Sequence, residues 1–358
     1  MEETEEKPKK RYCLKAFLGL TLTIILLLVV GYVVFWQFNK FPEPTGPIAK
    51  EYSWQYKNKT YNLRETLYQS IDSYYSKKIK GIFNNFEDIS VGRYLNTPEG
   101  DKTIPEVTQK IRELASKNQL TDDQTIDLTL SLVQSLPYDE ARAKTDLTHP
   151  RYPYETLFES KGICSDKTLL AVAILRQLGY GTAIFTYGQD QHMAAAVQCP
   201  SQYSNYNSGY CIAETTASGV KIGIIPELNQ SNLQAVQRSE AQAFNGKTDN
   251  QSQNKKLSNP EIFSKTNGKI YQGIAQTLTN EKEIAGISAY LDQQKPIIEK
   301  NESELSRLKT QLDQYYVQEN IQQYNNLVPI YNDLVRTTKR QIDEYNQKVV
   351  RYNALIKE

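Results

Sequence analysis

The 358-residue sequence predicts an α+β fold with an N-terminal transmembrane helix and a C-terminal helical region of coiled-coil character. Three observations lead to this prediction. Residues 16–36 contain no charged residue and are about as long as the apolar core of a bilayer requires. Residues 160–216 combine one apolar helix with three strand-like runs. Beyond residue 280, apolar residues recur at the 4/3 spacing of paired helices.

The apolar segment, residues 16–38, is flanked unequally by charge. Five basic residues precede it, whereas Lys40 and Lys50 are the only ones that follow closely. Positive charge marks the cytoplasmic side, so residues 1–15 are expected to form a cytoplasmic tail and the later residues to lie outside the cytoplasm. A cleaved signal peptide is the alternative, but its apolar region is shorter and needs a small-residue cleavage site. A single-pass anchor in the cell membrane is therefore favoured.

Residues 48–135 are expected to form an N-terminal hairpin followed by a helical segment. Aromatic residues on both sides of a polar turn in residues 52–63 predict the hairpin. Apolar residues at helical spacing predict three helices, over residues 64–78, 105–117 and 123–136. Thr121 and Asp122 supply the N-cap signal for the last of them.

The main domain is expected over residues 136–278. Its apolar helix begins at Cys164 or Ser165 and ends at Gly179, and residues that are apolar nearly all round predict that it is buried. An irregular loop with three prolines precedes this helix. Three strands follow it, over residues 182–187, 192–199 and 210–216. A polar insertion is expected at about 239–259.

The last part of the chain, residues 280–358, is predicted to be helical and coiled-coil-like. Just before it, Asn267 and Gly268 between alternating residues predict a tight β-hairpin. Tyr-Asn pairs recur at multiples of seven, and the heptad phase breaks near Pro329. This pattern predicts either two helices folded as a hairpin or one kinked helix. Pairing within the chain is favoured, and self-association through these helices is the alternative.

Charge and ligand spacing limit the partners that the sequence predicts. The formal charge is +1, from 42 basic and 41 acidic residues, which gives no electrostatic case for nucleic-acid binding. Two histidines and four scattered cysteines show no metal-ligand spacing, and there is no phosphate-binding loop. We therefore expect neither a metal nor another cofactor.

A cysteine, a histidine and a glutamate form the candidate catalytic site. Cys164 lies at the start of the apolar helix, where the helix dipole favours a thiolate. His192 opens an apolar strand and is the candidate base, while Glu214 is a lone acid in the next strand. The order helix-Cys, strand-His, strand-acid is that of papain-like nucleophilic sites. The alternative is a buried structural cysteine, a loop histidine and a rim glutamate.

The run "RYPYETLFESKGICSDKTLLAVAILRQLGY", followed by "HMAAAV" and "YCIAETT", resembles the transglutaminase-like superfamily, particularly its membrane-anchored prokaryotic members. The resemblance is clearest over residues 136–226. It implies a papain-like core in which Cys164 is the nucleophile, His192 its base and Glu214 the acid that orients the imidazole. Two motifs differ from the family pattern. Ile163 stands where the family often has an acid, and E-T-T replaces D-P-T around the third residue.

The resemblance implies an extracytoplasmic thiol enzyme that acts on acyl or amide bonds of proteins or peptides. Water as acceptor gives hydrolysis and an amine gives cross-linking; hydrolysis is preferred because it needs no second substrate site. The alternative is a catalytically inactive transglutaminase-like surface module that binds a protein or cell-envelope partner. Ile163 and the altered acid motif favour this alternative.

Cys199 and Cys211 bracket the connection between the last two strands of the main domain and are candidates for a disulfide. If these cysteines lie directly opposite each other, His192 lies opposite Ser218, four residues from Glu214. A regular hairpin therefore cannot place both pairs face to face. A bulge or an intermediate register satisfies both, so the disulfide and the His–Glu pair depend on the register of these strands.

Overall fold

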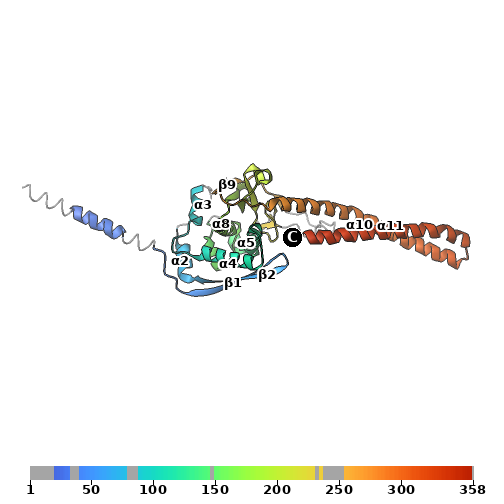
Figure 1. The fold of residues 1–358 in the computed structure, drawn as a ribbon, viewed down its shortest axis with the longest axis horizontal. Helices are drawn as coiled ribbons and strands as arrows, with labels where there is room; N and C mark the ends of the chain where they lie inside the picture. Colours follow the sequence, from blue (N-terminus) through green and yellow to red (C-terminus); the bar gives the residue numbers. More distant parts are fainter. Residues whose placement is uncertain are drawn as a thin grey trace, which may run out of the picture.

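The computed structural model describes residues 20–32, 40–78, 88–145, 149–229, 234–236 and 254–356. Figure 1 shows a body of helices and sheet from which a long pair of helices extends. Residues 20–32 are helical. Among the described residues no helix is both long and apolar enough to cross a bilayer. The remainder of the anchor expected over residues 16–38 lies outside the described residues, so the anchor stays a prediction.

The body contains an antiparallel four-stranded sheet with the strand order β5-β4-β3-β9. Every residue of β3 is buried, as are all those of β5 and all but the last of β4. Both faces of these strands are therefore covered, which explains their nearly continuous apolar sequences. The bounds are β3 (Thr182–Tyr187), β4 (His192–Gln198), β5 (Tyr210–Ala213) and β9 (Glu261–Phe263). The first two strands agree with the predicted ones within one residue, whereas β5 is shorter.

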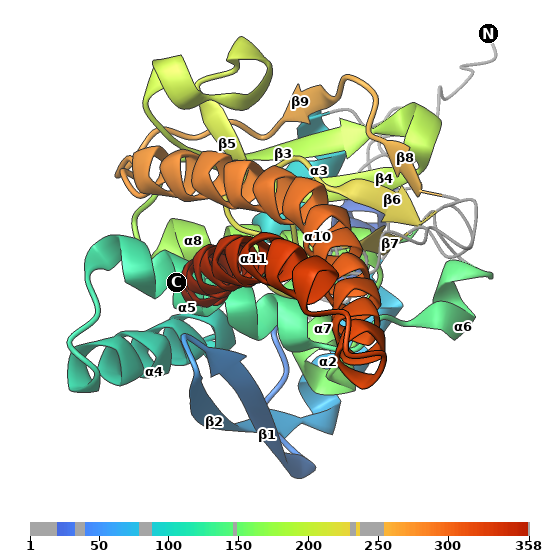
Figure 2. The same ribbon diagram turned by 90° about the vertical axis from the view of Figure 1, so that its right-hand side faces the viewer.

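Helix α8 (Cys164–Gln177) is the central helix of the body. One side packs on β3 and β4, and its other sides pack mainly on three helices, with a smaller contact to a fourth, α3 (Asp88–Leu95). The three main ones are α4 (Thr103–Lys117), α5 (Asp122–Ser135) and α7 (Pro153–Glu159). Figure 2 shows the sheet on one side of α8, and α4 with the hairpin β1–β2 on the other. This position confirms the buried helix that the sequence predicts.

The N-terminal hairpin consists of β1 (Pro47–Tyr56) and β2 (Lys59–Tyr68), which pair in antiparallel register along their whole length. The helix predicted over residues 64–78 is therefore wrong in its first part, because β2 continues to Tyr68. Leu63, Glu65 and Leu67 are buried in alternation, which is the period of a strand. The helix itself, α2 (Gln69–Lys77), begins only after this alternation ends.

Shorter elements complete the body. The proline-containing loop holds two helices and is thus less irregular than predicted. The polar insertion lies mostly outside the described residues, and its described end forms a strand of a small sheet with the order β7-β6-β8. The bounds are α3 (Asp88–Leu95), α6 (Glu140–Ala143), β6 (Glu227–Asn229), β7 (Gln234–Val236) and β8 (Asn254–Lys256), with 3-10 turns η1 (Gly188–Asp190), η2 (Ser201–Tyr203) and η3 (Asn205–Asn207).

The tight hairpin predicted at Asn267 and Gly268 is wrong. The residues before the turn pair with β3 through β9, and Lys269 after the turn forms a parallel bridge with Tyr180. Gly268 packs so closely on this backbone that an added Cβ would lie 2.5 Å from the Gly181 nitrogen. The glycine therefore serves close packing between chain segments, not a turn between paired strands.

The long arm consists of α10 (Ile274–Val317) and α11 (Ile321–Leu355), which pack side by side (Figure 1). Gln318–Asn320 join the two helices, and Glu319 adopts a left-handed φ of 56°. The hairpin alternative is therefore the correct one, and Pro329 lies within α11 without ending it. The arm begins earlier than residue 280, and the first residue of α10 is fully buried in the core of the body.

Candidate active site

The structure brings Cys164, His192 and Glu214 together from three separate elements. Cys164 is the first residue of α8, His192 is the first residue of β4, and Glu214 directly follows β5. Their residues are 4 %, 3 % and 0 % exposed. The site therefore lies where one helix and two strands of the body meet, and water has little access to its charges.

Glu214 is held by hydrogen bonds on both carboxylate oxygens. Oε2 lies 2.9 Å from Nε2 of His192. Oε1 accepts from the backbone nitrogens of Thr215 (2.8 Å) and Thr216 (2.6 Å) and from the Thr216 hydroxyl (2.7 Å). Burial acts to raise the pKa of Glu214, but the His192 charge and these hydrogen bonds outweigh it and lower the pKa. Glu214 is thus ionised although it is fully buried.

The carboxylate fixes the tautomer of His192. An ionised carboxylate only accepts hydrogen bonds, so Nε2 of His192 must carry the proton. In the neutral ring Nδ1 is then the basic nitrogen, and it has no hydrogen-bond partner among the described residues. Burial acts to lower the pKa of His192, whereas Glu214 and the adjacent Cys164 thiol raise it to about 10. The pair therefore strongly favours a protonated imidazole.

Cys164 is the one free cysteine among the described residues. Its Sγ lies 4.0 Å from the carbonyl oxygen of Gln191, the residue that precedes His192. Gln191 has a left-handed φ of 49°, so the chain turns sharply as it enters β4. The thiol therefore lies beside the entry to β4, next to the histidine that pairs with Glu214.

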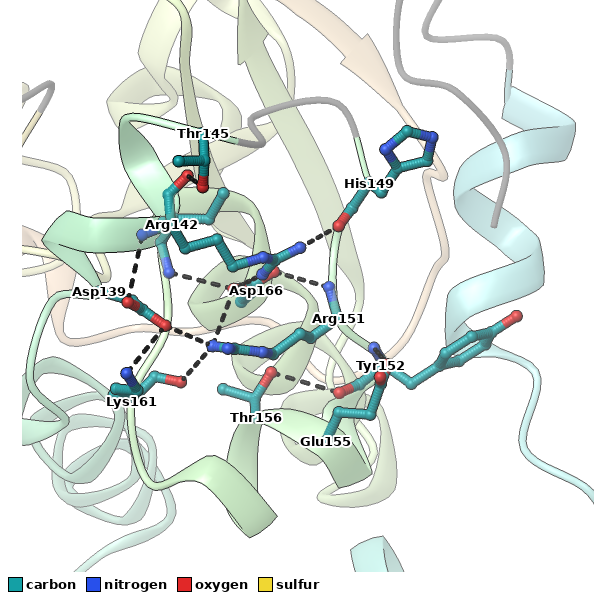
Figure 3. Close-up of polar contacts among 11 residues, drawn as sticks. Asp139, Arg142, Thr145, His149, Arg151, Tyr152, Glu155, Thr156, Lys161 and Asp166 are labelled. Atoms are coloured by element: carbon teal, nitrogen blue, oxygen red, sulfur yellow. Dashed lines mark hydrogen bonds and ion pairs between the residues drawn. The ribbon is translucent and has the colours of Figure 1, made fainter. Parts of the chain in front are cut away.

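A group of ion pairs holds the start of α8 in place (Figure 3). Asp166 is fully buried and accepts from the Ile163 nitrogen (3.1 Å), the Arg151 nitrogen (2.7 Å) and the Arg142 guanidinium. Arg151 also pairs with Asp139 at 2.9 Å. Asp166 thereby fixes the N-cap of α8, which is the residue before Cys164.

Two polar residues near the site carry contacts that residue spacing did not predict. Gln134 on α5 donates to the carbonyl oxygens of Glu214 (2.8 Å) and Val220 (2.9 Å). Lys167 on α8 is fully buried. Each is a long polar side chain among mostly apolar residues of a largely buried helix, and this was the signal in the sequence that could have identified them.

The second histidine, His149, takes no part in the site. Its carbonyl oxygen accepts from Arg142, and Figure 3 shows its ring directed away from the ion pairs. Among the residues that the structure describes, no group of three His, Cys, Asp or Glu side chains is arranged to hold a metal ion.

The disulfide between Cys199 and Cys211 is formed, with a Cα–Cα distance of 5.8 Å. Strand β4 pairs with β5 so that Val197 lies opposite Cys211. This is the intermediate register, because neither the two cysteines nor His192 and Glu214 lie directly opposite. Each pair is offset by two residues, and both contacts form in one regular ladder.

Comparison with known proteins identifies the domain. Residues 104–204 match a family model described as a transglutaminase-like domain. The match includes Cys164 and His192, while Glu214 lies ten residues beyond it. A search of curated proteins finds no match. The protein therefore carries a domain of the transglutaminase-like superfamily, as the sequence motifs predict.

Proposed function

We propose that the protein is a thiol enzyme that acts on acyl or amide bonds of proteins or peptides. Cys164 is the nucleophile, His192 the general base and Glu214 the group that orients the ring. The observation that carries this proposal is the 2.9 Å contact between His192 Nε2 and Glu214 Oε2 in a buried site. It leaves Nδ1 as the nitrogen that exchanges a proton with the thiol.

The reaction follows from these roles. Nδ1 of His192 takes the proton of Cys164, and the sulfur forms a bond to the substrate carbonyl carbon. The carbon–nitrogen bond of the tetrahedral intermediate then breaks, and the imidazolium returns the proton to the leaving amine. A thioester on Cys164 remains. Attack by water releases the acid and restores the thiol, whereas attack by an amine forms a new amide.

The start of α8 supports the negative oxygen of the intermediate. The first N–H groups of a helix have no acceptor within the helix, and the N–H of Cys164 is one of them. It therefore serves as a donor to the oxyanion, together with the positive end of the helix dipole. We prefer hydrolysis to cross-linking because water needs no binding site of its own.

We also propose that residues 16–38 anchor the protein in the cell membrane, with residues 1–15 in the cytoplasm and the main domain outside it. The charge-free apolar sequence and the preceding basic residues support this orientation. The disulfide between Cys199 and Cys211 supports it independently, because disulfides persist in oxidising compartments.

A catalytically inactive surface module is the second candidate. Ile163, in place of an acid, is buried and directly precedes Cys164. The end of the arm exposes three large apolar residues, Tyr316, Val317 and Ile321, which a protein or cell-envelope partner would cover. Self-association through the arm is a further form of the same candidate.

Release of a labelled peptide by the full-length protein in detergent tests the enzyme. We expect activity that Cys164→Ala and His192→Ala abolish and that His149→Ala, the matched change at the other histidine, leaves intact. Labelled amine added to the same reaction distinguishes cross-linking from hydrolysis. Partner capture that persists in Cys164→Ala, with no turnover of any labelled peptide in the unchanged protein, would favour the binding module.

A further inference from the structure

Lys167 places a buried positive charge one helical turn beyond Cys164. Its residue is fully buried on α8, and Nζ donates to two carbonyl oxygens at the end of α5. These are the oxygens of Gln134 (3.1 Å) and Leu136 (2.8 Å). Among the described residues no carboxylate lies within ion-pair distance of this ammonium group. A buried ammonium group without a carboxylate partner is costly, so the negative end of the α5 dipole and any negative charge nearby stabilise it.

The candidate active site supplies that charge. With the thiol ionised, Cys164 and Glu214 each carry one negative charge and His192 carries one positive charge. The three residues then hold a net charge of −1 in a site that is at most 4 % exposed. A net buried charge is unfavourable, and one further cation balances it. Lys167 is the cation that the structure places there.

The titratable groups of the site around Lys167 come from α8, from two strands of the sheet and from the end of α5, and the charges that act on Lys167 itself are those of Glu214 and Cys164. Cys164 and Asp166 lie on α8 itself, His192 on β4 and Glu214 after β5, while Tyr138 follows α5. Asp166 already pairs with Arg142 and Arg151. Burial lowers the pKa of Lys167 to about 8, and the charges of Glu214 and Cys164 oppose this shift. Lys167 is thus protonated at neutral pH and faces the two negative groups of the site.

We propose that Lys167 is the fourth charged member of the site, a positioning residue that keeps the Cys164 thiolate and the Glu214 carboxylate ionised together. This inference rests on the proposed thiol chemistry. It also explains why a lysine without a carboxylate partner is fully buried on this helix. The same two hydrogen bonds join α5 to α8, so a purely structural role has to be distinguished by experiment.

The test is the pH profile of Cys164 alkylation by iodoacetamide, read on the peptide that contains Cys164 by mass spectrometry. The full-length protein is compared with Lys167→Met, which keeps the length of the side chain and removes its charge. We expect the acid limb of the profile to move up by about one pH unit, so that alkylation on that limb is about tenfold slower at a given pH. Above about pH 9 the two proteins should react equally, because Lys167 is neutral there.

Two further variants make the outcome decisive. Lys161→Met removes a half-exposed lysine that pairs with Asp139, and it should leave the profile unchanged. Lys167→Arg keeps the charge, so the acid limb of its profile should stay where it is in the unchanged protein. If Lys167→Met does not melt cooperatively, Lys167→Arg provides the test in its place. A folded Lys167→Met with the unchanged profile would overturn the inference, as would a folded Lys167→Arg with a shifted acid limb. If Cys164 of the unchanged protein shows the alkylation profile of an ordinary thiol, the proposed enzyme function is refuted, and the inference is refuted with it.

Discussion

The substitution Glu214→Gln should inactivate the protein by reversing the tautomer of His192. Oε1 of Glu214 accepts from three donors, at 2.6–2.8 Å. An amide nitrogen at this position would face three donors without an acceptor, so the amide oxygen of the glutamine must take it. The amide nitrogen then replaces Oε2, 2.9 Å from His192 Nε2. Because this nitrogen only donates, the imidazole must leave Nε2 bare and carry its proton on Nδ1.

In that tautomer the nitrogen nearest the thiol no longer accepts a proton. The equivalent acid-to-amide change in a serine protease lowers kcat by about 10⁴ for the same reason. We expect a loss of about 10³–10⁴ in the rate of peptide release, which corresponds to about 4–5 kcal/mol of transition-state stabilisation. The protein should remain folded, because the three donors to Oε1 keep their acceptor, although its melting temperature falls with the loss of the buried His192–Glu214 charge pair.

The assay is peptide release by the full-length protein, with thermal melting measured on the same samples. Glu261→Gln, at an exposed residue of β9, is the matched control and should retain full activity. Activity within tenfold of the unchanged protein in Glu214→Gln would refute the reasoning. It would mean that the carboxylate does not set the tautomer, even though it lies within hydrogen-bond distance.

Three further outcomes are expected. The pKa of His192 is raised to about 10, so its contribution to the free energy of unfolding is complete below about pH 6.5 and is lost as pH rises through about 10. The melting temperatures of the unchanged protein and His192→Gln should therefore converge towards pH 10. A difference that stays constant with pH would contradict this. A chain ending at residue 279 should keep the cooperative melting of the body, whereas one ending at residue 257 should lose it, because it lacks β9 and the fully buried Ile274, worth about 2–5 kcal/mol. Protease added to intact cells should cleave the arm, and protection until the membrane is opened would reverse the proposed topology.

Local signals in the sequence predicted those parts of the fold that depend on neighbouring residues. Thr121 caps α5 through a reciprocal pair of hydrogen bonds with Gln124, which is the arrangement that the residue types favour. Gly179 follows α8 with a left-handed φ of 93°, as expected at the end of a helix. The position of Cys164 at the start of a buried helix is predictable in the same way, because both the helix start and the apolar run after it are visible in the sequence.

Contacts between distant segments limited the rest of the prediction. The end of β2 fits helical spacing in the sequence, and its strand character depends on a buried face that contacts a helix later in the chain. The hairpin prediction at Asn267 is wrong because the residues around it pair with β3 and Tyr180, which lie 75 or more residues earlier, and not with each other. Lys167 was missed for a similar reason, since its acceptors lie on α5 and no spacing rule connects them.

The register of β4 and β5 determines whether the candidate site can form. Moving β5 by two residues in one direction would place the cysteines directly opposite and separate His192 from Glu214 by four positions. Moving it by two residues in the other direction would place Glu214 directly opposite His192 and separate the two cysteines by four positions. The observed ladder places both pairs at an offset of two, which is the register that permits both contacts without a bulge. Because a shift by one residue would turn every side chain of β5 to the opposite face, the disulfide at one end of the ladder also holds Glu214 at the other.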